Sequence, residues 1–322
     1  NYKTVFFTLG ILLIILGVAM MVPVVFQLIY NEFDSTFITS GIITITFGIL
    51  FFLSNIDHLK LINTQQAFLL TALSWLSIAT FGSLPFFFSE LNLSITDSFF
   101  ESMSGITTTG ATILNNIENS PKGVLIWRAM LQWLGGIGVI LMAITLMPIM
   151  NIGGMQLLKI SSYDTSEKIL PKSKQISLRL ILVYLFLTLS CAIFYKIFGM
   201  NLFDSITHSM TTIATGGFSN YDQSIGYFNN AYIEVVSVLF ILLGSIPFIL
   251  YIKFISDDKK IIFKDEQVKL FFKLSLASIL ILFFYLIIFN KDLSQVHIRS
   301  VVFNVVSILT GTGYVTKEFA QW

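Results

Sequence analysis

Three clusters of threonine and glycine are the residues of this sequence best suited to chemistry, and they recur at matching positions. Residues 97–112 return 107 residues later as residues 204–219, with seven identical positions out of sixteen. A fainter copy occupies residues 300–315. Repetition at a fixed spacing indicates one structural unit that is used several times. We therefore expect the three clusters to contribute to one shared site.

Threonine and glycine in this pattern suit the binding of a dehydrated cation by backbone carbonyls. Glycine adopts backbone angles with φ > 0, so a segment that contains it can direct successive carbonyls toward one axis. A ring of such carbonyls can replace the water around a cation, and the carboxyl end of a short helix adds about half a negative charge. The candidate ion-binding residues are Thr107, Thr108, Thr109, Gly110, Thr215, Gly216, Gly217, Thr310, Gly311, Thr312 and Gly313.

The alternative is that these clusters only end helices or pack them closely, which is the commoner role of small residues in membrane proteins. Three copies in register favour ion binding, because each follows an amphipathic segment too short to span a bilayer. For Gly135, Gly136 and Gly138 we favour close helix packing instead. They lie inside a long apolar run and lack the preceding strand that a nucleotide-binding turn requires.

The composition predicts a membrane protein. Hydrophobic residues make up 55% of the chain and charged residues 11%, whereas a soluble domain carries about 25% charged residues. The net charge of +1 argues against nucleic acid as a partner. Cys191 is the single cysteine and excludes a disulfide framework. The three histidines, His58, His208 and His297, lack the spacing of metal ligands.

Apolar runs predict the helices, because a membrane span needs about 20 apolar residues. We expect two amino-terminal spans at 5–30 and 36–55, and read the first as a true span instead of a cleaved signal peptide. Further helices are expected near 60–90, 124–150, 176–198, 231–254 and 268–289. The expected organisation is two transmembrane helices in 1–58, repeats at 59–158 and 159–258, and an incomplete repeat at 259–322.

The charges of the loops predict the orientation. Lys and Arg number twelve in residues 56–61, 151–179 and 253–273, against one in residues 31–35, 89–123 and 199–230. Positive charge gathers on the cytoplasmic side of membrane proteins. We therefore expect a cytoplasmic amino terminus and all three Thr/Gly clusters near the outer face.

Five motifs together resemble the TrkH family, the membrane subunits of Trk potassium uptake systems in the Trk/Ktr/HKT superfamily. They are T-T-T-G-A-T at 107–112, W-R-A-M-L-Q-W-L-G-G-I-G at 127–138, G-G-M-Q-L at 153–157, I-A-T-G-G-F-S at 213–219 and T-G-T-G-Y-V-T at 310–316. The resemblance covers essentially the whole chain. It implies an all-α membrane protein with helix–pore-loop–helix repeats around a central pore, four in the family, preceded by two extra transmembrane helices.

The resemblance also implies a function, which is potassium uptake across the cell inner (plasma) membrane by a multi-pass subunit, with no enzymatic activity. Potassium (K+) would bind at the candidate residues, with filter glycines at Gly110, Gly217 and Gly313. The implied partners are a second copy in a homodimer, a cytoplasmic nucleotide-binding regulatory subunit resembling TrkA, and membrane lipid. A sodium-permeable or poorly selective relative is the alternative. A membrane enzyme is disfavoured because Glu101 and Glu234 have no catalytic partner nearby in the sequence.

Two features depart from the family pattern. The fourth repeat and the second helix of the third repeat do not occur within the 322 residues, which suggests a fragment of a longer protein. Gly311 stands where threonine is more usual, and we expect it to loosen the third cluster. Glu101 is expected to have a structural role, tying its short helix to a neighbouring pore element.

Overall fold

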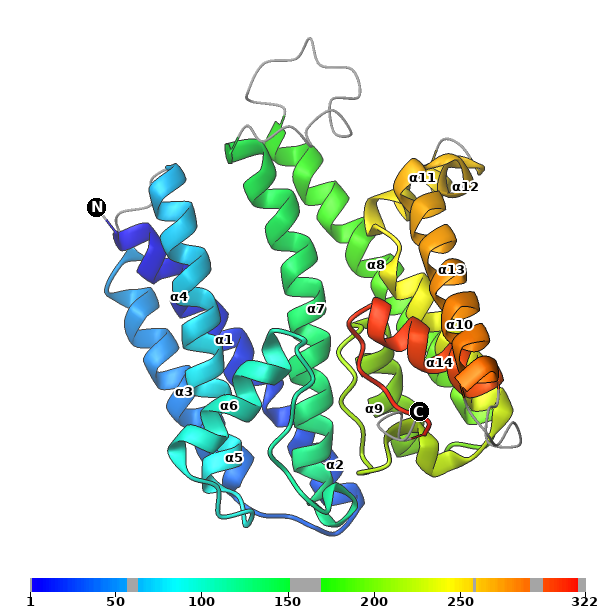
Figure 1. Cartoon of the computed structure of the whole chain (residues 1–322). Helices are drawn as coiled ribbons and strands as arrows, with labels where there is room; N and C mark the ends of the chain where they lie inside the picture. Colours follow the sequence, from blue (N-terminus) through cyan, green and yellow to red (C-terminus); the bar gives the residue numbers. More distant parts are fainter. Residues whose placement is uncertain (1, 57–62, 151–168, 257–258, 290–297, 318–322) are drawn as a thin grey trace. The chain divides into compact units, whose positions relative to one another are not determined.

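The computed structural model describes residues 2–56, 63–150, 169–256, 259–289 and 298–317 (Figure 1). All regular elements within these residues are helices, which confirms the predicted all-α class. The chain forms two compact units, each described here by itself. The first comprises Asn1–Thr107, Ala111–Leu114 and Asn119–Lys174, and the second comprises Thr108–Gly110, Asn115–Glu118 and Gln175–Trp322.

The amino-terminal helices of the first unit are held together by glycines. Helix α1 (Lys3–Ala19) continues through α2 (Met21–Ile29) and packs along α3 (Thr36–Leu53). A Cβ atom at Gly10 would lie 2.6 Å from the backbone nitrogen of Phe52, and one at Gly48 would lie 2.9 Å from the carbonyl of Gly10. The absence of side chains at these contacts lets the two backbones approach closely, as in other membrane helix pairs.

The rest of the first unit carries the first repeat. Helix α4 (Thr64–Gly82) begins at a capping box formed by Asn63 and Gln66, and α5 (Leu84–Phe88) follows it. The short α6 (Ile95–Ile106) lies beside α4 and the long α7 (Lys122–Met150) (Figure 1). The buried indole of Trp127 donates a 2.9 Å hydrogen bond to the carbonyl of Gly82, which joins α7 to α4.

The second unit contains the second repeat and the described part of the third. Its helices are α8 (Ile169–Ile197) from Gln175 onward, α9 (Leu202–Ile213), α10 (Ala231–Ser245), α11 (Phe248–Ser256), α12 (Ile261–Lys264), α13 (Glu266–Phe289) and α14 (Ile298–Leu309), with the 3-10 helix η5 (Ser224–Phe228). The short α9 contacts α10, and the short α14 contacts both α10 and α13. Each repeat therefore places a short helix beside long ones.

The prediction of one continuous helix near residues 231–254 is wrong. Helices α10 and α11 meet at an angle of 86°. Pro247 causes this break, because proline has no N–H to donate and its ring forces the preceding residue out of the helical region. Ile246 accordingly has extended backbone angles, with φ −74° and ψ 135°.

Six helices of the described residues are long and apolar enough to cross a membrane, and the bent pair α10–α11 would make a seventh. They are Lys3–Ile29, Thr36–Leu53, Thr64–Phe88, Lys122–Met142, Gln175–Ile197 and Glu266–Ile288. These spans agree with those expected from the apolar runs, and the protein is a multi-pass membrane protein. Most residues of the basic loops 56–61 and 151–179 lie outside the described residues.

Candidate ion-coordination site

Each Thr/Gly cluster follows a half-helix, the name used here for α6, α9 and α14. All three have 12 residues, and their bounds coincide when the repeats are aligned. A helix of that length spans about 18 Å, less than the hydrocarbon core of about 30 Å. Ser94 and Asn201 cap the amino ends of α6 and α9. The half-helices predicted from the repeats are therefore present and too short to cross a membrane.

The backbone of the three clusters follows one pattern. Gly110, Gly217 and Gly313 have φ of +78°, +78° and +79°. Two residues earlier, Thr108, Thr215 and Gly311 are also left-handed, with φ of +55°, +49° and +76°. The predicted use of φ > 0 is confirmed at these glycines, whereas Gly216 does not have a positive φ. The second left-handed position in each cluster was not foreseen from the sequence.

The earlier left-handed residue ends the half-helix. The N–H of Thr215 bonds the carbonyl of Thr212, and the N–H of Gly216 bonds that of Thr211, which is a Schellman arrangement. A left-handed β-branched residue is a conformational outlier, so Thr215 stores strain that Gly311 avoids in the third cluster. The glycine that was expected to loosen the third cluster therefore occupies a position where its conformation is required.

Within the second unit, the second and third clusters meet closely. A Cβ atom added to Gly217 would lie 1.7 Å from the carbonyl oxygen of Thr312, whereas a Cβ at Gly313 would meet nothing within 4 Å among the described residues. Both the backbone angle and the close contact therefore require glycine at position 217. At position 313 only the backbone angle requires it. The segment Thr108–Gly110 belongs to the same compact unit as these two clusters.

Glycines of the long helices receive the last carbonyl of two half-helices. A Cβ at Gly135 of α7 would lie 1.9 Å from the carbonyl oxygen of Ile106, and one at Gly244 of α10 would lie 2.8 Å from that of Ile213. The predicted packing role of Gly135 is confirmed. Gly138 has open space around its Cβ position among the described residues, so the prediction fails there.

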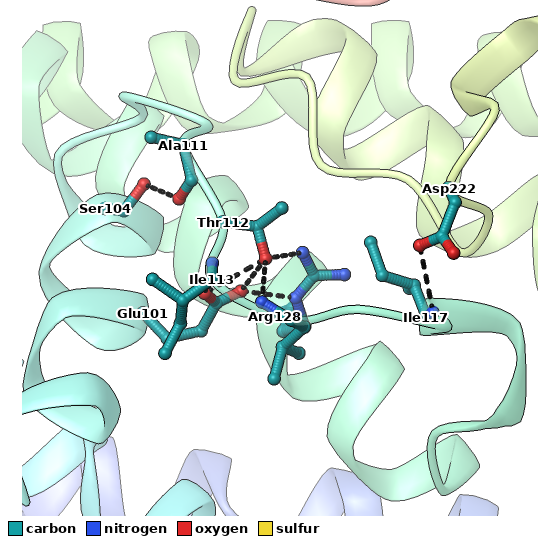
Figure 2. Close-up of polar contacts among 9 residues, drawn as sticks. Glu101, Ser104, Ala111, Thr112, Ile113, Ile117, Arg128 and Asp222 are labelled. Atoms are coloured by element: carbon teal, nitrogen blue, oxygen red, sulfur yellow. Dashed lines mark hydrogen bonds and ion pairs between the residues drawn. The ribbon is translucent and has the colours of Figure 1, made fainter. Parts of the chain in front are cut away.

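A buried ion pair holds the chain that follows the first cluster (Figure 2). Glu101 of α6 and Arg128 of α7 are almost completely buried, and Arg128 Nε lies 2.7 Å from Glu101 Oε1. The hydroxyl of Thr112 lies 2.9 and 3.1 Å from the two carboxylate oxygens and accepts from Arg128 Nη2 at 3.1 Å. The N–H of Ile113 donates to Glu101 Oε2 at 3.2 Å. The structural role predicted for Glu101 is confirmed, but its partners belong to its own repeat.

His208 takes the place of Glu101 in the second repeat. Its Nδ1 lies 2.9 Å from the carbonyl of Asp204, and its Nε2 lies 3.0 Å from the hydroxyl of Ser219. A carbonyl can only accept, so Nδ1 carries the proton, and in neutral imidazole Nε2 accepts from Ser219. No group of three or more His, Cys, Asp or Glu side chains that could hold a metal occurs in the described part of the chain, where neither His58 nor His297 lies.

Asn304 takes the same place in the third repeat. Its Oδ1 accepts the N–H of Thr316 at 3.3 Å. One turn later, the hydroxyl of Ser307 donates to the carbonyl of Tyr314 at 2.8 Å. In the first repeat, Ser104 donates in the same way to the carbonyl of Ala111 (Figure 2).

A network of hydroxyl groups lies behind the second and third clusters. The phenol of Tyr314, directly after Gly313, hydrogen-bonds the hydroxyl of Thr211 in α9. The phenol of Tyr195 bonds the hydroxyls of Thr212 and Ser237. These bonds connect the third cluster to the half-helix of the second repeat. Cys191 is a buried free cysteine.

Carboxylates fix the chain beyond the clusters. Asp204, in the first turn of α9, accepts from Asn220 Nδ2 and from the phenol of Tyr221, each at 2.7 Å. Burial, together with the bond to Asp204, raises the pKa of Tyr221. Asp222 accepts the N–H of Ile117 at 3.1 Å (Figure 2) and the N–H of Asn116 at 3.0 Å. No motif in the sequence pointed to these contacts.

Comparison with known proteins identifies relatives along the whole chain. A family model described as TrkH, cation transport protein, matches residues 34–322. The Trk system potassium uptake protein TrkI of Halomonas elongata is 36% identical over 316 residues, which cover 98% of this chain and 64% of that protein. The Trk system potassium uptake protein TrkH of Escherichia coli K12 is 34% identical over 331 residues, which cover 100% of this chain and 68% of that protein.

A solved structure has the same fold. The crystal structure of the potassium transporter TrkH from Vibrio parahaemolyticus matches with a TM-score of 0.89 and 33% identity, covering 100% of this chain and 67% of that one. This chain thus spans about two thirds of the length of these relatives. The matched family is one of cation transporters, not of enzymes. The sequence match over most of the chain and the shared helical fold lead to one conclusion: the chain belongs to the TrkH family of cation transport proteins.

Proposed function

We propose that the protein takes up potassium through a selectivity filter lined by the backbone carbonyls of residues 107–110, 215–217 and 310–313. The observation that carries this proposal is the shared left-handed pattern of the three clusters, with φ of +78° to +79° at their glycines. Alternation of left-handed and other residues turns successive peptide groups, and so lets carbonyls face one axis. Carbonyls that face one axis can replace the hydration shell of potassium.

The half-helices add a favourable electrostatic contribution. Each cluster begins where a half-helix of 12 residues ends. The carboxyl end of a helix carries about half a negative charge. Three such ends directed at the filter would favour a cation without a carboxylate in the ion path.

We propose for the whole transporter the arrangement that the resemblance to the TrkH family implies. The repeats at 59–158, 159–258 and 259–322 surround a central pore in the cell inner (plasma) membrane, and residues 1–58 form the two extra helices. The amino terminus is cytoplasmic, as the twelve basic residues of loops 56–61, 151–179 and 253–273 favour. Potassium enters down the membrane potential, which supplies about 2.3 kcal/mol per charge per 100 mV.

The proposed partners follow from the family. The transporter forms a homodimer, contacts membrane lipid, and is regulated by a cytoplasmic nucleotide-binding subunit that resembles TrkA. Curated relatives carry the name Trk system potassium uptake protein, and the word "system" supports the existence of further subunits. Copurification of the tagged natural protein from its own membranes tests this part.

A sodium-permeable or poorly selective transporter is the second candidate, which the same backbone pattern would allow. The two are distinguished by expressing the natural protein in a bacterium that lacks potassium uptake. We expect growth at low potassium, and uptake of radioactive rubidium that excess potassium suppresses and excess sodium does not. Equal suppression by sodium would establish the second candidate, and no uptake of either ion would refute both.

A further inference from the structure

The seventh residue of each half-helix presents a hydrogen-bond acceptor to the chain that leaves the cluster. These residues are Glu101, His208 and Asn304. They differ in charge, shape and size, so the aligned repeats do not reveal their common feature. The described structure reveals it, because all three side chains are buried and hydrogen-bond the segment that follows the cluster glycine. Glu101 and Asn304 accept these bonds, and His208 accepts in its neutral form.

The donor differs among the repeats in a way that the local sequence explains. Thr112 and Ser219 occupy aligned positions, and their hydroxyls lie 2.9 Å from Glu101 Oε1 and 3.0 Å from His208 Nε2. Val315 stands at that position in the third repeat and has no hydroxyl. There the next N–H, that of Thr316, bonds the half-helix residue instead.

The hydroxyls of the first two repeats also fix the backbone beyond them. Thr112 Oγ1 accepts the N–H of Leu114, and Ser219 Oγ accepts the N–H of Tyr221, both at 3.2 Å. Each hydroxyl thus donates to the half-helix and accepts from its own chain two residues on. Thr112 and Ser219 thus match in both of these hydrogen bonds, and two unrelated contacts would not share both.

We propose that Glu101, His208 and Asn304 are positioning residues for the selectivity filter, and that an acceptor at this place is the requirement they share. We call the three contacts the filter latches. The proposal rests on the proposed function, since it presumes that the clusters coordinate the ion. A left-handed glycine has no side chain to limit its motion, and its carbonyls keep their direction only if the chain is fixed on both sides. The half-helix fixes one side and the latch fixes the other.

In the first repeat the acceptor of the latch is the charged carboxylate of an ion pair. Arg128 neutralises Glu101 and also donates to Thr112. In the second repeat Ser237 precedes Gly244 by seven residues, as Arg128 precedes Gly135, and it bonds Tyr195 instead of the half-helix residue. Charge is therefore not the shared requirement, and the acceptor can be tested separately from it.

The test compares matched variants of the natural protein, with or without the acceptor. In the second repeat, His208→Gln keeps an acceptor and His208→Leu removes it. In the first repeat, Glu101→Gln with Arg128→Met removes both charges and keeps an acceptor, whereas Glu101→Leu with Arg128→Met removes the acceptor as well. The milder Ser219→Ala and Thr112→Val remove the hydroxyl, and with it both its bond to the half-helix and the bond that it accepts from the backbone. They serve if a leucine variant does not fold.

The measurements are the ratio of potassium to sodium uptake in cells and the yield of monodisperse protein. We expect variants without the latch to lose the potassium preference about tenfold or more per correctly folded protein. Variants that keep the acceptor should stay within about twofold of the unmodified ratio. Glu234→Gln with Arg299→Met removes an ion pair of 2.7 Å outside the latches and should leave the ratio unchanged.

Two results would overturn the proposal. One is an unmodified ratio in folded Ser219→Ala and Thr112→Val, which would give the latches a folding role only. The other is an equal loss in both members of each matched pair, which would implicate side-chain size instead of the acceptor. Failure of the proposed function is distinct from these, since it would appear as absent or unselective uptake by the unmodified protein.

Discussion

The polar contacts behind the first and second Thr/Gly clusters differ in their chemistry, although the backbone of the clusters is the same. The chain that follows the first cluster is bonded to a buried ion pair between Glu101 and Arg128. Behind the second lie an imidazole, that of His208, and neutral hydroxyls. The cluster glycines nevertheless have the same φ of +78°. The geometry of the cluster is therefore compatible with very different side chains behind it.

The difference matters for stability because an ion pair and a neutral hydrogen bond respond differently to the loss of one partner. A buried ion pair gains little over a well-packed apolar pair, but removal of one partner leaves an uncompensated buried charge. A neutral hydrogen bond has a small net contribution, and its loss costs less. The first repeat should thus be sensitive to the loss of a single partner, and the second repeat should not.

The largest expected effect comes from Arg128→Met alone. It leaves the carboxylate of Glu101 buried without its counter-ion and should lower the free energy of unfolding by about 3–5 kcal/mol. The added Glu101→Gln should restore most of this loss, and His208→Gln in the second repeat should cost about 1 kcal/mol. Thermal unfolding of the detergent-purified protein measures all three, and equal losses in Arg128→Met and His208→Gln would refute the contrast.

The glycines that receive the half-helix carbonyls provide the next comparison. Gly135→Ala would place its Cβ 1.9 Å from the carbonyl of Ile106, whereas the equivalent distance at Gly244 is 2.8 Å. Overpacking costs about 1–3 kcal/mol, so folded yield should fall more in Gly135→Ala than in Gly244→Ala. Gly138→Ala is the control with open space. A normal yield for Gly135→Ala would show that α6 and α7 can separate at this contact.

The cluster glycines differ between the second and third repeats. Gly217→Ser would meet the carbonyl of Thr312 and a left-handed backbone, whereas Gly313→Ser would meet the left-handed backbone alone. Strained backbone costs about 1–3 kcal/mol, and the clash adds to it at Gly217. We expect both to lower the potassium-to-sodium uptake ratio, and Gly217→Ser to lower it more. An unchanged ratio in folded Gly217→Ser would remove this residue from the proposed filter.

The smallest expected effect concerns the residue that ends each half-helix. Gly311→Thr introduces into the third repeat the left-handed threonine of the other two, and should destabilise the protein by about 1 kcal/mol. Thr215→Gly should be nearly neutral, because relief of strain is offset by a more flexible unfolded chain. Melting temperatures compare the two. A stabilising Gly311→Thr would mean that the backbone of the third cluster relaxes to accept the side chain.

The sequence by itself determined the elements and the positions of the clusters. Apolar runs predicted the spans because a bilayer requires about 20 apolar residues in succession. The internal repeats placed the three half-helices in the correct register, and the glycines at 110, 217 and 313 predicted a left-handed backbone that the structure has. The break at Pro247 could also have been predicted from the proline.

Only the tertiary structure decided which residues act together behind the clusters. Glu101 and Arg128 are 27 positions apart, and Tyr314 meets Thr211 across 103 positions. No periodicity connects such residues, because their contact depends on how the helices pack. The aligned repeats place Glu101, His208 and Asn304 at the same position. Their common role could not be read from the residue types, because the three share neither charge nor shape. Whether an acceptor atom meets its donor depends on the position of both in space. Only the folded structure therefore shows that three different side chains place an acceptor at the same point.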